Sequence, residues 1–379
     1  SLRRDKEGGL YLSLVNQGKH QAHVTLENRT DRILAVKELR MEDGEVQEAG
    51  YLGRKSSMIL APYESRYYRF RAAKYANEAV LPGKRRTQRI KISCREPFAV
   101  TPLHPNVYRL AEFDISRDGE NWFRTEPMTL IEHAAAFPLL GKDDYEYTSS
   151  FGTPKHIYMK FPLKIYFRTE FEIATGIEKM ELLFDRRTVS GDYQIRINGK
   201  RLNPETFYYR FVNDENNRLC DISEFIKTGE NTVEVEVTAW QESDGLRDPL
   251  YLLGEFGVSE KHILTEQPSS ALFDSHFIKG FPYYSGKMLF EKEVELSLDE
   301  LEDDFELAFD FGDECLDCLE VRLNSVQLGV RAFTPYVWKC RKDIVRQGKN
   351  HLELIRTNTL AGMLDGTYFD YDSHSLVHI

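Results

Sequence analysis

Aromatic side chains with polar neighbours are the residues of this sequence whose types and spacing could do chemistry. Trp240 is followed at short range by Gln241, Glu242, Arg247 and Asp248. A flat ring can cover the apolar face of a sugar, while polar groups around it hydrogen-bond the hydroxyls. The group Trp240, Arg247 and Asp248 is therefore a candidate carbohydrate-binding loop.

Two further aromatic pairs fit the same chemistry. They are Tyr208 with Tyr209, and Tyr336 with Trp338. Such rings can instead fill a core or a domain interface, because aromatic residues are common in half-buried strands. Both interpretations stay open for these two pairs.

Motifs for covalent or metal-dependent reactions are sparse. Hydrolysis of a glycosidic bond needs two carboxyl groups about 5–10 Å apart, but adjacent acids such as Asp143/Asp144 and Asp303/Asp304 are typical of exposed turns. The motifs Gly-x-Ser-x-Gly and His-Glu-x-x-His do not occur, and the ten histidines are scattered. We therefore predict no catalytic residue, no cofactor and no specific metal ligand. A structural Ca²⁺ on the oxygen-rich run 213–217 is one option, and a solvated loop is the alternative.

The five cysteines give no disulfide framework, because their number is odd and they are widely spaced. Cys315 and Cys318 form a Cys-x-x-Cys, but residues 319–324 have the pattern of a strand and no second ligand pair follows. We expect ordinary, partly buried thiols and a cytoplasmic location.

Apolar and polar residues alternate with a period of two in runs such as 194–198, 232–237 and 305–310. Successive side chains of a strand point to opposite faces, so each run predicts a strand with one core face and one solvent face. This pattern is typical of antiparallel sandwiches, and the chain is predicted to be all-β.

An internal repeat determines the predicted architecture. The segment 166–237 recurs at 289–355, with Asn198 matching Asn324, and Gly229 and Asn231 matching Gly348 and Asn350. Asn198-Gly199 is a strong hairpin signal, whereas the second copy has Asn324-Ser325. We predict a small N-terminal β-sandwich at 1–75 and two similar tandem β-sandwiches at 76–258 and 259–379.

Composition excludes several classes of protein. The net charge of −11 argues against nucleic-acid binding, and the basic run 84–86 is expected to be a solvated loop. A membrane span needs about 18 consecutive apolar residues, and no such run is present. With 41% hydrophobic residues, the chain can build cores.

The motif Ile-Asn-Gly, Asp-Ile, Gly-Glu-Asn-Thr, Val-x-Val at 197–237 resembles the sugar-binding-like jelly roll of glycoside hydrolase family 2, a galactose-binding-like domain. Residues 248–258 and 280–296 are similar to the C-terminal part of bacterial α-L-rhamnosidases of glycoside hydrolase family 106. In these families the catalytic carboxylates lie on a (β/α)8 barrel, for which this sequence has no pattern. Because the chain begins without Met, we expect it to be a piece of a longer polypeptide.

The resemblance implies a non-catalytic accessory region of a bacterial glycoside hydrolase. Its expected partners are the catalytic barrel of the same polypeptide and carbohydrate. Two alternatives remain: a scaffold that binds no sugar, and a β-sandwich enzyme acting on polysaccharide.

Overall fold

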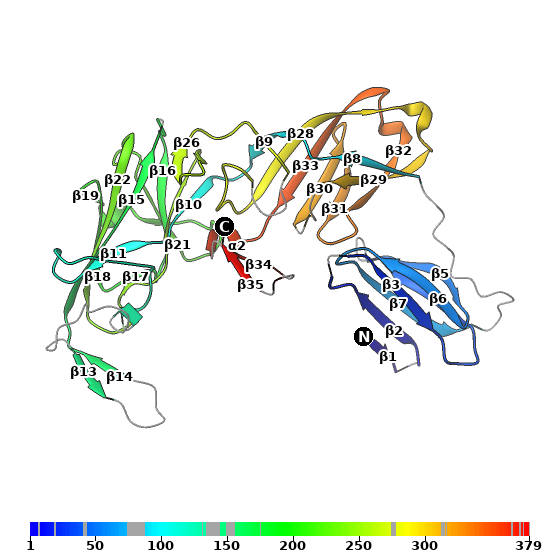
Figure 1. Ribbon diagram of the computed structural model, residues 1–379, viewed down its shortest axis with the longest axis horizontal. Coiled ribbons are helices and arrows are strands. Elements are labelled where there is room, and N and C mark those ends of the chain that lie inside the picture. Colours follow the sequence, from blue (N-terminus) through cyan, green and yellow to red (C-terminus); the bar gives the residue numbers. More distant parts are fainter. Residues whose placement is uncertain are drawn as a thin grey trace. The chain divides into compact units, whose positions relative to one another are not determined.

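The computed structural model describes the chain except residues 7, 19, 41–43, 74–87, 131, 134–144, 149–155, 175, 274–277, 312–314, 316, 365–366, 371–372, 374 and 379. The chain forms two compact units. One comprises Ser1–Thr101, Ser270–His276 and Lys287–Asn358, and the other Pro102–Ser269, Phe277–Gly286 and Thr359–Ile379. Strands dominate both units (Figure 1), so the predicted all-β class is confirmed for the described residues.

The N-terminal segment is a small sandwich, as predicted. Its larger sheet has the order β1-β2-β7-β4-β5, and β3 pairs with β6 in the second layer. Apolar side chains of both layers share one core, in which Leu26 and Met58 pack against Val36, Tyr68 and Phe70. The bounds are β1 Leu2–Arg4, β2 Leu10–Val15, β3 Ala22–Glu27, β4 Leu34–Leu39, β5 Val46–Leu52, β6 Lys55–Leu60 and β7 Ser65–Ala72.

The second body, here called the first module, comprises residues 102–269. Its two sheets have the orders β10-β24-β16-β21-β20 and β12-β11-β15-β22-β18-β19. Their inner faces form one core, to which Leu182 and Phe184 contribute from one sheet and Phe167 and Val235 from the other. The bounds are β10 Asn106–Leu110, β11 Phe113–Ser116, β12 Phe123–Thr125, β15 Leu163–Ile173, β16 Met180–Asp185, β17 Val189–Ser190, β18 Asp192–Ile197, β19 Lys200–Arg201, β20 Tyr208–Tyr209, β21 Asn217–Asp221, β22 Gly229–Ala239, β23 Gly245–Leu246, β24 Leu250–Gly254, β25 Gly257–Val258 and β26 Ile263–Thr265.

The third body, here called the second module, comprises residues 88–101, 270–273 and 287–358. Its sheets have the orders β27-β9-β28-β33-β30-β31 and β32-β29-β8. Phe98, Phe290 and Phe305 fill its core with Trp338, which is fully buried. The bounds are β8 Arg89–Ser93, β9 Phe98–Pro102, β27 Ser270–Ala271, β28 Lys287–Leu296, β29 Asp304–Asp310, β30 Cys318–Leu323, β31 Val326–Arg331, β32 Val337–Arg341 and β33 Gly348–Thr357.

Strand pairing does not follow the linear boundaries predicted at 75/76 and 258/259. β8 pairs in parallel with β29, and β9 pairs with β27, so residues 88–101 complete the second module. The C-terminal residues 359–379 belong to the unit that holds the first module. They contain α2 (Ala361–Leu364), β34 (Thr367–Asp370) and β35 (Ser375–His378), and that unit also contains the hairpin of β13 (Tyr145–Thr148) and β14 (His156–Met159). Among the described residues, no helix is both long and apolar enough to cross a membrane.

A buried asparagine holds the start of β22 in the first module. Asn231 is fully buried. Its Oδ1 accepts hydrogen bonds from the Lys227 backbone N–H (2.9 Å) and from Asn198 Nδ2 (2.8 Å). Its Nδ2 donates to the carbonyls of Lys227 (2.7 Å) and Gly229 (2.9 Å). One side chain thus satisfies the backbone of the turn that leads into the strand.

The second module repeats this network residue for residue. Asn350 is fully buried, and its Oδ1 accepts from the Arg346 N–H and from Asn324 Nδ2, both at 2.8 Å. Its Nδ2 donates to the carbonyls of Arg346 and Gly348, also at 2.8 Å. The matched asparagines of the sequence repeat are therefore the residues that form equivalent contacts in both modules.

The two hairpins of the repeat differ in one residue of the turn. Asn198 and Gly199 have φ of 51° and 75°, and Asn324 and Ser325 have φ of 50° and 68°. Both turns need two left-handed residues, which is the conformation of a type I′ hairpin. The predicted Asn-Gly hairpin is therefore present, and Ser325 adopts the conformation that glycine has in the other copy.

Ser325→Gly is expected to stabilise the second module. A left-handed conformation costs an L-residue roughly 1–2 kcal/mol, and glycine loses part of that gain through the entropy of the unfolded chain. We expect the free energy of unfolding to rise by about 0.5–1 kcal/mol in urea titrations. Gly199→Ser is the matched control, because a Cβ there meets nothing within 4 Å. It should destabilise the first module by a similar amount, and unchanged midpoints in both variants would contradict the argument.

Candidate carbohydrate-binding surface

Trp240 lies in the loop after β22, and its ring is fixed in an exposed position. The side chain is 56% exposed. Its Nε1 donates to Asp192 Oδ2 (2.8 Å), while its backbone N–H donates to Asp244 Oδ2 (2.9 Å). An exposed ring that is held at both the backbone and the indole nitrogen loses little entropy when a ligand stacks on it.

The loop that carries Trp240 is built on a buried carboxylate. Asp244 is buried and also accepts from the Gln241 backbone N–H (3.2 Å) and its side-chain Nε2 (3.3 Å). Gly191, in the turn before β18, allows that turn to lie close to the end of β22 and to Asp244. It has φ of 90°, and a Cβ there would lie 2.7 Å from the Thr238 carbonyl.

The contacts of Arg247 and Asp248 are with residues other than Trp240. The Arg247 guanidinium donates twice to the Arg187 carbonyl, and its Nε lies 3.1 Å from that oxygen. Asp248 is exposed and acts electrostatically on Asp185. These two predicted residues therefore border the neighbouring turn at residues 185–188.

Tyr208 and Tyr209 point to opposite sides of the sheet, because they are consecutive in β20. The Tyr208 hydroxyl donates to the Glu181 carboxylate, which also pairs with Arg210 (2.5 Å). Burial and this carboxylate raise the pKa of Tyr208 to about 12. Tyr209 is 58% exposed on the other side. The predicted pair therefore does not make one platform.

Arg218 stands beside Tyr209 and was not predicted from the sequence. Its guanidinium lies 5.8 Å from the Tyr209 ring centroid and 5.3 Å from that of Phe207. Its Nη1 donates to the Tyr193 hydroxyl (2.7 Å). A hydrogen-bonding cation among aromatic rings is suited to the polar rim of a sugar site. The sequence alone does not show that Arg218 lies beside these rings, because that depends on the register of β21.

The prediction for Trp338 is corrected by the core of the second module, whereas Tyr336 is half-buried. Trp338 is fully buried, and its Nε1 donates to the Gly329 carbonyl (3.0 Å). The Tyr336 hydroxyl donates to the Asp317 carbonyl (2.6 Å). Trp338 faces inward because it alternates with exposed residues in β32 at the position that meets Phe309. Its ring has no face for a ligand.

Asp185, the last residue of β16, is an exposed carboxyl group with a raised pKa. Partial burial raises the pKa of Asp185, and the carboxylates of Asp214 and Asp248 raise it further. Asn217 Nδ2 donates to Asp185 Oδ1 (2.7 Å) and opposes this shift. A raised pKa is one property of a general acid, so Asp185 is the residue to substitute in a test of the enzyme alternative.

In the run 213–217, the predicted Ca²⁺ candidate, the side-chain oxygens of Asn217 and Asp214 accept hydrogen bonds within the loop. Asn217 Oδ1 accepts from the backbone N–H groups of Val212 (3.2 Å), Asn213 (3.0 Å) and Asp214 (3.0 Å). Asp214 Oδ1 accepts from the backbone N–H (2.7 Å) and Nδ2 (2.9 Å) of Asn216. This arrangement is that of a polar loop that satisfies its own backbone.

The cysteines form no disulfide, and the described pair of adjacent acids is exposed. All five cysteines are free, and burial raises the pKa of Cys315 to about 11, so it is protonated near neutral pH. Asp303 and Asp304 are exposed, as predicted for a turn. Asp143, Asp144 and the basic run 84–86 lie outside the described residues.

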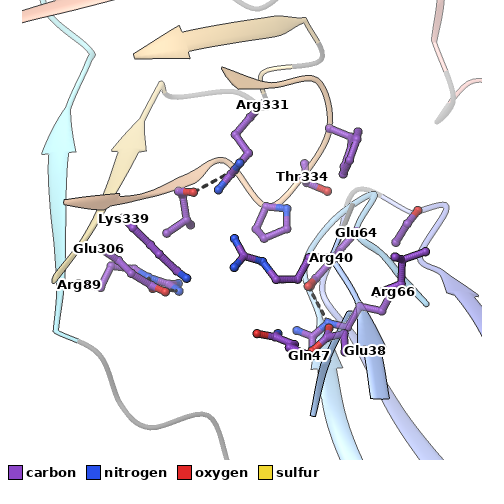
Figure 2. A pocket seen from close by; sticks show the side chains of 15 residues that line it. Glu38, Arg40, Gln47, Glu64, Arg66, Arg89, Glu306, Arg331, Thr334 and Lys339 are labelled. Carbon is purple, nitrogen blue, oxygen red and sulfur yellow. Dashed lines mark hydrogen bonds and ion pairs between the residues drawn. The ribbon is translucent and has the colours of Figure 1, made fainter. Parts of the chain in front are cut away.

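A polar hollow of about 160 Å³ lies within the unit that contains the second module (Figure 2). Several of the charges that line it are already paired: Arg66 with Glu64 (2.7 Å) and Arg89 with Glu306 (2.6 Å). Arg331 Nε donates to the Val337 carbonyl (3.1 Å). The lining also includes Glu38, Arg40, Gln47, Phe333, Thr334 and Lys339. None of these residues was predicted, because the lining combines segments far apart in sequence.

Comparison with known proteins gives structural likenesses only. No family model and no curated protein matches the chain. Similar solved structures include a β-D-mannosidase from Dictyoglomus thermophilum (10% identity, TM-score 0.28), a rhamnosidase from Novosphingobium sp. PP1Y (16%, 0.23) and a glycosyl hydrolase family 2 member from Bacteroides cellulosilyticus (12%, 0.28). These matches cover 66%, 66% and 67% of this chain, and the chain spans only 31%, 23% and 31% of theirs.

Proposed function

We propose that this chain is a non-catalytic accessory region of a bacterial glycoside hydrolase, which supports the catalytic domain and binds carbohydrate at Trp240. The observation that carries the sugar-binding part is the exposed indole, held by Asp192 and Asp244 at one end of the first module. The accessory role is supported by the repeated jelly-roll module and its resemblance to the family 2 motif at 197–237. Five free thiols fit a cytoplasmic location.

The chemistry of this surface fits a neutral or weakly polar sugar face. The apolar face of a pyranose would stack on the indole, which excludes water from its C–H groups. The Asp192 carboxylate, beside Nε1, and the Gln241 amide would lie near enough to accept or donate hydrogen bonds at the ring edge. Such sites have few polar groups, which orient the ligand.

Trp240→Ala is expected to reduce sugar affinity at least tenfold, because it removes the stacking surface while Asp244 still holds the loop. The measurement is native affinity electrophoresis in gels that contain galactan, rhamnogalacturonan, β-mannan or xyloglucan. Tyr51→Ala, which removes another partly exposed ring (38%) from the N-terminal sandwich, is the control and should migrate like the unmodified chain. Equal retardation of Trp240→Ala and the unmodified chain would show that this loop is not the binding site.

The scaffold alternative is favoured by one observation. Phe211 is 74% exposed and apolar, which suits a contact with another domain more than a contact with hydroxyl groups. If no polysaccharide retards the unmodified chain, the scaffold interpretation replaces sugar binding. Turnover of aryl glycosides by the purified chain that is lost in Asp185→Asn would instead establish the enzyme alternative.

A further inference from the structure

Three potential metal ligands meet on the solvent side of the larger sheet of the second module. They are Glu291 of β28 and His351 and Glu353 of β33. One ligand atom from each lies within 4.8 Å of the other two. All three side chains are partly exposed, so an ion could reach them from solvent.

The register of β28 and β33 brings these three side chains together. Glu291 lies directly opposite Glu353, and Glu293 lies opposite His351. Alternate residues share a face, so all four side chains project from the same side of the sheet. His351 Nε2 lies 3.2 Å from Glu291 Oε1, and Nδ1 lies 3.6 Å from Glu293 Oε1.

In the first module, the pair of residues equivalent to Glu291 and Glu353 has opposite charges. Asn231 and Asn350 are equivalent, so Glu234 corresponds to Glu353, and its direct partner across the strands is Arg168. The second module has a glutamate where the first has an arginine. Like charges that lie directly opposite each other destabilise a sheet, unless a cation lies between them.

The nearest cation on the next strand is already engaged. Arg322 of β30 lies opposite Glu353, but its Nη2 pairs with Glu320 Oε1 at 2.7 Å. The two opposed glutamates therefore have His351 as their neighbour, and its imidazole is a ligand that transition metals prefer.

We propose that Glu291, His351 and Glu353 form a binding site for a divalent transition-metal ion of the Zn²⁺ class. His351 Nε2 would bind the ion with one oxygen from each glutamate, and water would complete the coordination. Tetrahedral ligands at zinc lie about 3.4 Å apart, so small rotations of the glutamate side chains close the site. Glu293 would accept the Nδ1–H and orient the ring, as carboxylates do behind metal-bound histidines.

The test is a titration of the full chain with ZnCl2 by calorimetry. The expected result is one Zn²⁺ per chain, with affinity at least tenfold weaker in Glu291→Gln and in His351→Thr. Threonine is the residue of the first module at this position (Thr232), so the strand should tolerate it. His23→Thr, a change at an exposed strand histidine of the N-terminal sandwich, is the matched control and should bind like the unmodified chain.

Two further measurements distinguish this site from the cysteines and test the role of the opposed glutamates. Co²⁺ should bind without thiolate-to-cobalt charge-transfer absorption, which would appear if Cys315 and Cys318 were the ligands instead. Glu291→Arg restores the charge pair of the first module, and should abolish Zn²⁺ binding while raising the melting temperature of the metal-free chain. Unchanged Zn²⁺ affinity in His351→Thr and Glu291→Gln, or no uptake by the unmodified chain, would overturn the proposal.

Discussion

Asn350→Ala is expected to lower the free energy of unfolding of the second module by about 3–4 kcal/mol. The side chain makes four hydrogen bonds, two of them to the backbone of Arg346 and one to the carbonyl of Gly348. Alanine would leave these groups buried without a partner, and each such group costs about 1 kcal/mol or more. The start of β33, which pairs with both β28 and β30, would lose its anchor.

Trp338 reports the unfolding of this module directly. The chain has three tryptophans, so Trp122→Phe and Trp240→Phe leave Trp338 as the one indole, and it is fully buried. Its fluorescence in urea gives the transition of the second module. Gln327→Ala, which removes an exposed amide from β31, is the control and should change stability by less than about 0.5 kcal/mol. A loss below about 1 kcal/mol in Asn350→Ala would contradict the role of the network.

The repeat makes the reciprocal experiment informative. Asn231 has the same four contacts in the first module. Asn231→Ala should therefore increase hydrogen exchange in β22 and its neighbours and leave the transition seen by Trp338 unchanged. A loss in both modules would mean that they unfold as one cooperative unit.

Much of the fold could be predicted because its signals are local. Alternation with period two identifies strands such as 232–237 from the sequence alone. The matched asparagines identified the repeat, and the structure shows why they recur, since each one satisfies a turn. The placement of 88–101 was missed, because the choice of sheet for a strand depends on which distant strand it meets, and β8 meets β29 more than 200 residues later.

The candidate site was predicted less well, and for a similar physical reason. Trp240 could be selected as a candidate because its own loop contains polar residues. Trp338 has similar neighbours in sequence, but it alternates into a core, and the phase of alternation in a five-residue strand cannot be read without its partner. Asp192, Arg218 and Glu291 were missed because their contacts cross between strands that are far apart in the chain.

Asp317→Ala is the second change with a large expected effect, about 3–5 kcal/mol in the second module. Arg356 Nε donates to Asp317 Oδ2 at 2.6 Å, and the side chains are only 3% and 11% exposed. The guanidinium also lies 5.4 Å from the centroid of Phe273. Alanine removes a carboxylate that pairs with this buried guanidinium, and breaking a buried ion pair is far more costly than losing a surface one.

The double variant Asp317→Ala/Arg356→Met separates the charge from the packing. Methionine fills most of the volume of the arginine stem among the apolar neighbours of β33, and buried ion pairs can often be replaced by apolar residues at little cost. We therefore expect the double variant to be more stable than Asp317→Ala alone, in urea titrations followed by Trp338 fluorescence. If the losses from Asp317→Ala and Arg356→Met were simply additive, the two groups would not be coupled, and the buried pair would have no energetic role beyond packing.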